Sequence, residues 1–220
     1  DSCNNVYFTL MAGGHNPRPA KYRRWRQRSL HKFVYYKERF GVNLCVGCGK
    51  CTHACNTMHF VPPMQQWIRV YEVLDNPEAG PYYVARPCMH CDNPPCTKVC
   101  PVYATYINEE GLVGQINYRC IGCRYCTTAC PYTVKYFNWY DPEWPKEMRG
   151  SLNRDVSLRT KGVVEKCTFC AERLAQGLMP ACVEASNGAL IFGDLQDDKS
   201  EVRETLRKYF TIRRKAHLGT

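Results

Sequence analysis

The chain has 220 residues, of which 16 are cysteines, and a formal net charge of +10 at pH 7. Such a cysteine content indicates either a disulfide scaffold or a metal protein. Disulfide scaffolds are usually short secreted chains with dispersed cysteines. Here most cysteines lie two or three residues apart, whereas zinc sites usually use two well-separated pairs. The composition therefore favours iron–sulfur clusters over disulfides and over zinc.

The positive charge of the chain has a simple explanation. A basic chain could bind nucleic acid, but four cubanes with their thiolates would add roughly −8 and leave the loaded protein near neutral. We therefore expect no nucleic-acid partner. No stretch reaches the roughly 18 to 20 apolar residues that a membrane span needs. A charged segment follows Arg23 and Arg24, so these two residues do not predict a twin-arginine signal.

The segment before the first cysteine row is basic and aromatic. Residues 1–20 predict an irregular lead-in, in which we interpret Cys3 as a free thiol rather than a cluster ligand. Aromatic residues recur at helical spacing over 21–40 and predict an amphipathic helix that packs on its own domain or on a neighbouring subunit. We interpret His53 and His59 as surface or supporting groups, because the cysteines already fill the ligand pattern.

Four rows of closely spaced cysteines organise the chain. Row three follows the pattern C-x2-C-x2-C-x3-C-P. Three thiolates in such a loop hold three irons of one cubane, and the fourth ligates the other cluster in two-cluster ferredoxins. Row one has the same spacing, row two has a four-residue middle gap, and row four has an eleven-residue gap and ends early. The rows are Cys45, Cys48, Cys51 and Cys55; Cys88, Cys91, Cys96 and Cys100; Cys120, Cys123, Cys126 and Cys130; and Cys167, Cys170 and Cys182.

Alternating residues between the rows predict short strands. The predicted strands are 67–73, 82–85, 103–107, 112–116 and 134–140, of which the third and fourth form a hairpin. Residues 141–160 predict a polar connection. A closing helix is predicted over 197–215, because acidic residues lie at its start and basic residues at its end.

Between residues 45 and 195 the chain resembles a known family. The order of the rows, the gaps in rows two and four and the run Glu-Lys-Cys-Thr-Phe-Cys at 165–170 are similar to the electron-transfer subunit of the membrane-associated molybdopterin oxidoreductases. These include the dimethyl sulfoxide, polysulfide and tetrathionate reductases, formate dehydrogenases and related quinone-linked respiratory complexes. The segment 188–194 shares this resemblance, whereas residues 31–51 are more similar to sulfhydrogenase-type iron–sulfur subunits.

The resemblance implies an α+β fold of two interleaved bacterial-ferredoxin-like modules with N- and C-terminal extensions. Rows one and four would form the first module, and rows two and three the second. The implied divisions are a basic and aromatic extension at 1–44, a first module at 45–87 and 160–193, a second module at 88–159, and a helical tail at 194–220.

The resemblance also implies four ligand sets, because the fourth cysteine of each row crosses to the cluster of its partner row. Site A has Cys45, Cys48 and Cys51; site B has Cys167, Cys170, Cys182 and Cys55; site C has Cys88, Cys91, Cys96 and Cys130; site D has Cys120, Cys123, Cys126 and Cys100. The fourth ligand of site A should stand at position 186, which is a serine. We therefore expect three 4Fe–4S clusters and one 3Fe–4S cluster, at site A. The alternatives are four 4Fe–4S clusters, with the oxygen of Ser186 or of water on the last iron, and a ligand from Cys3.

The sequence predicts no catalytic group, because it contains no nucleophile elbow, phosphate loop or recognisable carboxylate pair. We interpret the chain as an electron-transfer subunit that is not an enzyme on its own and has no small-molecule substrate of its own. The resemblance implies a relay of single electrons in anaerobic respiration, peripheral to a membrane, between a catalytic subunit of the molybdopterin type and an integral membrane subunit carrying quinone or haem. Basic segments at 21–40 and 207–215 are the candidate docking surfaces. The alternatives are a subunit of a hydrogenase or sulfhydrogenase-type complex and a zinc-ribbon interaction module.

Overall fold

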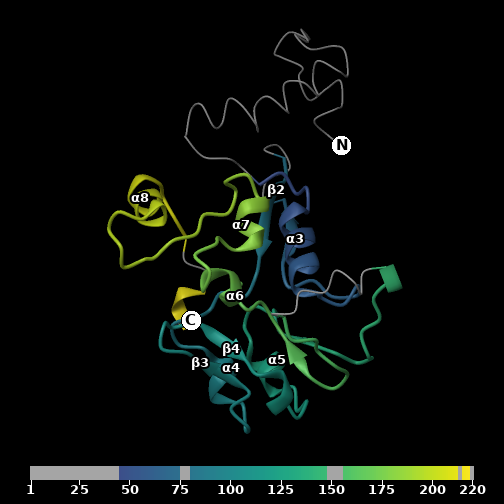
Figure 1. Ribbon diagram of the computed structural model, residues 1–220. Helices are drawn as coiled ribbons and strands as arrows, with labels where there is room; N and C mark the ends of the chain where they lie inside the picture. Colours follow the sequence, from purple (N-terminus) through teal and green to yellow (C-terminus); the bar gives the residue numbers. More distant parts are fainter. Residues whose placement is uncertain (1–44, 75–79, 148–155, 213–214, 219–220) are drawn as a thin grey trace.

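The computed structural model describes residues 45–74, 80–147, 156–212 and 215–218, and its regular elements are short (Figure 1). The helices are α3 (Lys50–His59), α4 (Pro95–Lys98), α5 (Tyr125–Ala129), α6 (Ala171–Leu174), α7 (Ala181–Ala185) and α8 (Glu201–Lys208), with 3-10 turns η4 (Asn117–Arg119) and η6 (Ala216–Leu218). The sheets are antiparallel pairs: β1 (Arg69–Val73) with β2 (Tyr82–Arg86), β3 (Thr105–Ile107) with β4 (Val113–Gln115), and β5 (Tyr136–Phe137) with β6 (Val164–Glu165). Cys3 and the predicted helix over 21–40 lie outside the described residues. Among these elements, no helix is long and apolar enough to cross a bilayer.

The strand predictions hold for β1 to β4, including the hairpin of β3 and β4. The strand predicted over 134–140 is much shorter and contains only the two residues of β5. Thr133 has a φ of 54°, so the segment before β5 is not extended. After β5, the side-chain amide of Asn138 donates to the carbonyl of Thr160 at 3.3 Å, and the backbone bends at the next two residues. Side-chain hydrogen bonding to the backbone therefore ends the strand.

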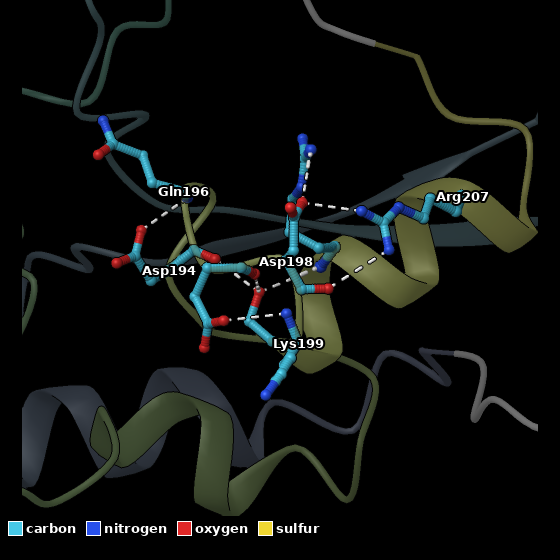
Figure 2. A network of polar contacts seen from close by, with 8 residues as sticks. Asp194, Gln196, Asp198, Lys199 and Arg207 are labelled. Carbon is cyan, nitrogen blue, oxygen red and sulfur yellow. Dashed lines mark hydrogen bonds and ion pairs between the residues drawn. The ribbon is translucent and has the colours of Figure 1, made fainter.

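The closing helix is also shorter than the predicted range 197–215, because α8 covers only Glu201–Lys208. Polar contacts form a turn before the helix (Figure 2): Asp194 accepts from the Gln196 backbone at 2.8 Å, and Asp198 pairs with Arg207 at 2.8 Å. Ser200 caps the helix by accepting from the Arg203 backbone N–H. The helix ends where aromatic and β-branched residues of low helix propensity follow, at 209–212.

The helices pair in a way that brings distant rows together. The helix α3, which carries the end of row one, packs against α7, which carries the end of row four. The helices α4 and α5, from rows two and three, pack against each other. Figure 1 shows α3, α7 and β2 in its upper half and α4, α5, β3 and β4 in its lower half.

Cysteine side chains form much of the hydrophobic core. The first cluster of buried residues contains Cys51, Cys55, Val61, Trp67, Ile68, Tyr136 and Cys167. The second contains Cys96, Val113, Cys126 and Val164. Both clusters are small for a chain of this length, so the packing depends on what the thiols bind.

A buried ion pair joins the end of row one to the start of row four. The Nε of Arg159 donates to Oε2 of Glu165 at 2.6 Å, and these side chains are only 3% and 1% exposed. A second guanidinium nitrogen donates to the carbonyl of Phe60 at 2.8 Å, and the guanidinium lies 5.0 Å from the ring centroid of Trp67. The pair therefore ties the segment after α3 to β6.

The substitution Arg159→Met should destabilise the loaded protein by about 3–5 kcal/mol, because it leaves the carboxylate of Glu165 buried without a partner. The midpoint of thermal unfolding, followed by bleaching of the cluster absorbance, measures this loss. The double variant Arg159→Met/Glu165→Leu removes both charges and should recover much of the stability. A single variant that unfolds at the wild-type temperature would show that the pair contributes nothing.

Candidate metal centres

The four rows share one backbone feature. The residue before the second cysteine has a positive φ in every row: 70° at Gly47, 43° at His90, 70° at Gly122 and 62° at Phe169. A Cβ at Gly122 would lie 2.3 Å from the carbonyl oxygen of Gly162, so only glycine fits there. His90 and Phe169 adopt the left-handed conformation at a cost of roughly 1–2 kcal/mol each. Every row therefore makes the sharp turn that a loop around a cluster requires.

The thiols of site B come from the first and last rows. Burial raises the pKa of Cys55, and the thiols of Cys167, Cys182 and Cys170 lie close enough to raise it further by electrostatic interaction. Burial also raises the pKa of Cys167 to about 12 and that of Cys182 to about 11. The structure thus places the fourth cysteine of row one beside row four.

The thiols of site C come from rows two and three. Burial raises the pKa of Cys91 to about 11, followed by the effect of Cys88, with smaller effects of Cys96 and Cys130. These four cysteines line one nearly filled cavity of about 10 Å³. The fourth cysteine of row three therefore lies with row two.

Site D shows the reciprocal exchange. Burial raises the pKa of Cys126, which also interacts with Cys120 of its own row and with Cys100 of row two. The remaining cysteine, Cys123, lines a surface groove of about 970 Å³. Exposed aromatic side chains of Tyr125, Trp139 and Tyr140 border this groove. Site D is therefore open to the surface on one side.

The three thiols of site A lie together at an open cavity. Burial raises the pKa of Cys51, hydrogen bonds from Thr52 lower it, and Cys45 and Cys48 raise it electrostatically. The three cysteines and Ser186 line a cavity of about 630 Å³. Position 186 therefore borders site A, where the missing fourth ligand was expected.

The hydroxyl of Ser186 already has two partners in its own segment. It donates to the carbonyl of Val183 at 2.8 Å and accepts from the backbone N–H of Leu190 at 3.0 Å. These bonds close the loop that follows α7. The hydroxyl thus acts as a local cap for this segment.

Adjacent sites meet through pairs of interacting thiols. The pairs are Cys51 with Cys182 for sites A and B, Cys167 with Cys88 for sites B and C, and Cys96 with Cys126 for sites C and D. The sites therefore follow one another in the order A, B, C, D. Site A and site D are the ends of this series.

Backbone N–H groups point at several of the sulfurs. The bonds run from Ala104 to Cys100 at 3.2 Å, from Val164 to Cys120 at 3.4 Å and from Phe169 to Cys167 at 3.4 Å. At Cys100, burial acts to raise the pKa, but backbone hydrogen bonds from Thr105, Val102 and Ala104 outweigh it and lower the pKa overall. Such donors stabilise the negative charge that a thiolate carries when it binds metal.

Two buried lysines lie between the inner sites. Lys135 interacts with Cys96 and Cys126, and its ammonium donates to Thr105 at 2.7 Å and to Gln115 at 2.9 Å. Burial lowers its pKa, and the nearby thiols oppose that effect. Lys166 interacts with Cys96 and Cys167 in the same way and donates to the Cys167 carbonyl at 2.7 Å. Each lysine thus places a cation where two anionic sites would meet.

Two buried histidines also pack near the rows. Burial lowers the pKa of His59 to about 4, with Arg159 and Arg173 adding to the effect, and burial lowers the pKa of His90 to about 3. The ring of His90 lies 4.7 Å from that of Phe169, so rows two and four meet there. His59 Nε2 lies 3.1 Å from Cys170 Sγ. His53, the other histidine near row one, is exposed.

The residues present fit iron–sulfur clusters. All fifteen row cysteines are free thiols, and they gather into four groups. Deprotonated cysteine is the usual ligand of such clusters, which supply one-electron redox centres when bound. Backbone N–H donors and buried cations beside the thiols match the negative charge of the group.

Comparison with known proteins agrees with this chemistry. Three models described as 4Fe-4S dicluster domains match residues 1–59, 44–104 and 80–148. The iron–sulfur cluster-binding subunit of menaquinone reductase from Nitratidesulfovibrio vulgaris is 39% identical, over 87% of this chain and 89% of that protein. The protein belongs to the family of iron–sulfur subunits of the respiratory reductases.

Other members of this family of reductase subunits have similar coverage of the chain. A protein from Halobacterium salinarum, named as the iron–sulfur subunit of a dimethyl sulfoxide reductase, is 44% identical, over 76% of this chain and 69% of that protein. One of the polysulfide reductase proteins of Wolinella succinogenes is 37% identical, over 81% and 86%. The chain is therefore an iron–sulfur electron-transfer subunit with ferredoxin-like domains, and not a catalytic subunit. The hydrogenase and zinc-ribbon alternatives fit these relatives less well.

The sequence predictions missed the side chains that surround the thiols. His59 could have been found, because Cys51, Cys55 and His59 recur every four residues and share one face of α3. Lys135 gave no such signal, because it lies in a predicted strand where a lysine normally faces solvent. Its burial depends on Thr105 and Gln115, which the hairpin of β3 and β4 brings to it.

The crossed ligand sets predict that Cys55→Ser changes the cluster at site B and leaves site A intact, although Cys55 belongs to row one. Redox titration followed by EPR of the purified complex distinguishes the sites. As a matched control from the same helix, Cys51→Ser should change site A instead. If both variants alter the same signal, the exchange of fourth cysteines does not occur.

Proposed function

We propose that the chain carries three 4Fe–4S clusters at sites B, C and D and one 3Fe–4S cluster at site A, and relays single electrons along this series. The ligands would be the cysteines of the four sites, with the fourth cysteine of each complete row in the site of its partner row. The observation that carries the proposal is the unbroken order of thiol groups from A to D.

The surroundings of the sites support a relay with two ends. The inner site C lies around a cavity of only about 10 Å³, whereas sites A and D line open cavities of about 630 and 970 Å³. A relay needs its end centres near the surface, where a donor and an acceptor can approach. The inner centres need protection from solvent, which burial provides.

The same geometry supports two interleaved ferredoxin-like modules. Rows one and four supply sites A and B and the helix pair α3 and α7; rows two and three supply sites C and D and the pair α4 and α5. On this basis the modules would cover 45–87 with 160–193, and 88–159. Lys166 would lie at the boundary, because it interacts with Cys96 and with Cys167.

A three-iron cluster at site A is supported by the hydrogen bonds of Ser186. A hydroxyl that coordinates iron loses its proton and its donor role, whereas this hydroxyl donates to Val183 and accepts from Leu190. Ligation by Ser186 would therefore break a local cap. The four-iron alternative is less compatible with this arrangement.

The substitution Ser186→Cys should convert site A into a four-iron site, because it supplies the absent thiolate. We expect one additional iron per chain and loss of the EPR signal of an oxidised three-iron cluster from anaerobically purified complex. The matched control Ser186→Ala removes the hydroxyl and should leave that signal unchanged. A changed signal in Ser186→Ala would instead identify the serine oxygen as a ligand.

The partners would be a catalytic subunit of the molybdopterin type and an integral membrane subunit with quinone or haem, which would hold the chain at the membrane surface. The support comes from the relatives, whose names identify them as parts of menaquinone, dimethyl sulfoxide and polysulfide reductases. The groove at site D, with exposed Tyr125 and Trp139 beside Cys123, has the apolar character of a subunit interface.

Affinity purification under anaerobic conditions, followed by mass spectrometry of the companions, tests this assignment. We expect a molybdopterin-binding catalytic protein and a protein with several membrane spans to copurify in stoichiometric amounts. A nickel–iron hydrogenase subunit in their place would overturn the proposed partners, while the iron content would still report on the four sites.

A further inference from the structure

One buried histidine contacts a sulfur of site B directly. His59, the last residue of α3, has its Nε2 atom 3.1 Å from Sγ of Cys170, and the histidine is only 2% exposed. Cys170 caps the N-terminus of α6. The contact therefore connects α3, which carries Cys55, to the segment that carries Cys170.

The ring of His59 is held in this orientation by its neighbours. Its Nδ1 atom lies 3.2 Å from Oε1 of Glu172, on the first turn of α6. Its face stacks on Trp67, with ring centroids 5.1 Å apart and an angle of 28° between the planes. A carboxylate on one ring nitrogen and an aromatic ring on its face leave the other nitrogen aimed at Cys170.

The chemistry of the two atoms decides the direction of the bond. A cysteine sulfur on iron carries no proton, so it can only accept a hydrogen bond. The Nε2 atom must therefore carry the hydrogen, and both the imidazolium and the Nε2–H tautomer do so. A hydrogen bond to a ligand sulfur withdraws negative charge from the cluster and raises its reduction potential.

We propose that His59 is a positioning residue for site B that donates an Nε2–H hydrogen bond to Cys170 Sγ and thereby raises the reduction potential of that cluster relative to the same site without the donor. The inference rests on the proposed ligand set of site B. Glu172 and Trp67 hold the imidazole in place, and the role needs no change in protonation during electron transfer.

The test compares three variants in the intact, anaerobically purified complex by EPR-monitored redox titration. Cys182→Ser first identifies the signal of site B. His59→Phe keeps an aromatic ring against Trp67 but removes the donor, and we expect the equilibrium constant for reducing site B to fall about tenfold, which is about 59 mV for one electron. His59→Gln places an amide N–H near the same point and should restore most of the potential.

The matched control is His53→Phe, because His53 lies on the same helix and is exposed. It should leave the potential of site B unchanged. The inference is overturned if His59→Phe keeps full iron content and the wild-type potential, or if His59→Gln is as low as His59→Phe. These outcomes differ from failure of the proposed function, in which no signal responds to Cys182→Ser.

A second measurement applies if His59→Phe does not retain its cluster. Wild-type protein with 15N-labelled histidine, examined by pulsed EPR on the reduced site B signal, should show a coupling to a histidine nitrogen. His59→Gln, labelled in the same way, should lack it. Absence of the coupling from the labelled wild-type protein would refute the hydrogen bond.

Discussion

The structure depends on the need of closely spaced thiols for a shared metal group. Five cysteines are part of the two hydrophobic clusters, and the aliphatic and aromatic residues around them are few. Thiols that crowd together in a buried place raise one another's pKa and repel one another once ionised, as Cys55 does among Cys167, Cys170 and Cys182. Iron removes both difficulties, because it replaces the protons and binds the thiolates together. The folding of this chain and the binding of its cofactors are therefore one process.

The remaining buried charges are arranged around that negative charge. Lys135 and Lys166 lie between neighbouring thiol groups, and each is held by uncharged acceptors rather than by carboxylates. A carboxylate partner would have cancelled the lysine charge, whereas a carbonyl, hydroxyl or amide acceptor leaves it available to the clusters. Arg159 differs, because it is paired with Glu165 and fixes the packing of two segments. The net charge of +10 therefore includes cations placed beside the sites as well as cations at the surface.

The sequence was informative where spacing alone decides the chemistry. The rows, the shortfall at Ser186, the hairpin of β3 and β4 and the first two strands followed from local patterns. The bounds of β5 and α8 did not, because side chains such as Asn138 and Ser200 bond the backbone and end or begin an element at a particular residue. The contact of His59 with Cys170 joins positions far apart in the chain, so local spacing could place His59 on the cysteine face of α3 but could not name its partner.

The exchange of fourth cysteines has a consequence for biogenesis. On the proposed ligand sets, every ligand of sites C and D lies between Cys88 and Cys130, so this half of the protein can be loaded once that stretch has left the ribosome. Site B cannot be completed before Cys182 has been made, although its first ligand, Cys55, appears early. The nascent chain would thus hold row one in waiting, and the iron-delivery machinery would have to protect those thiols until translation is almost finished.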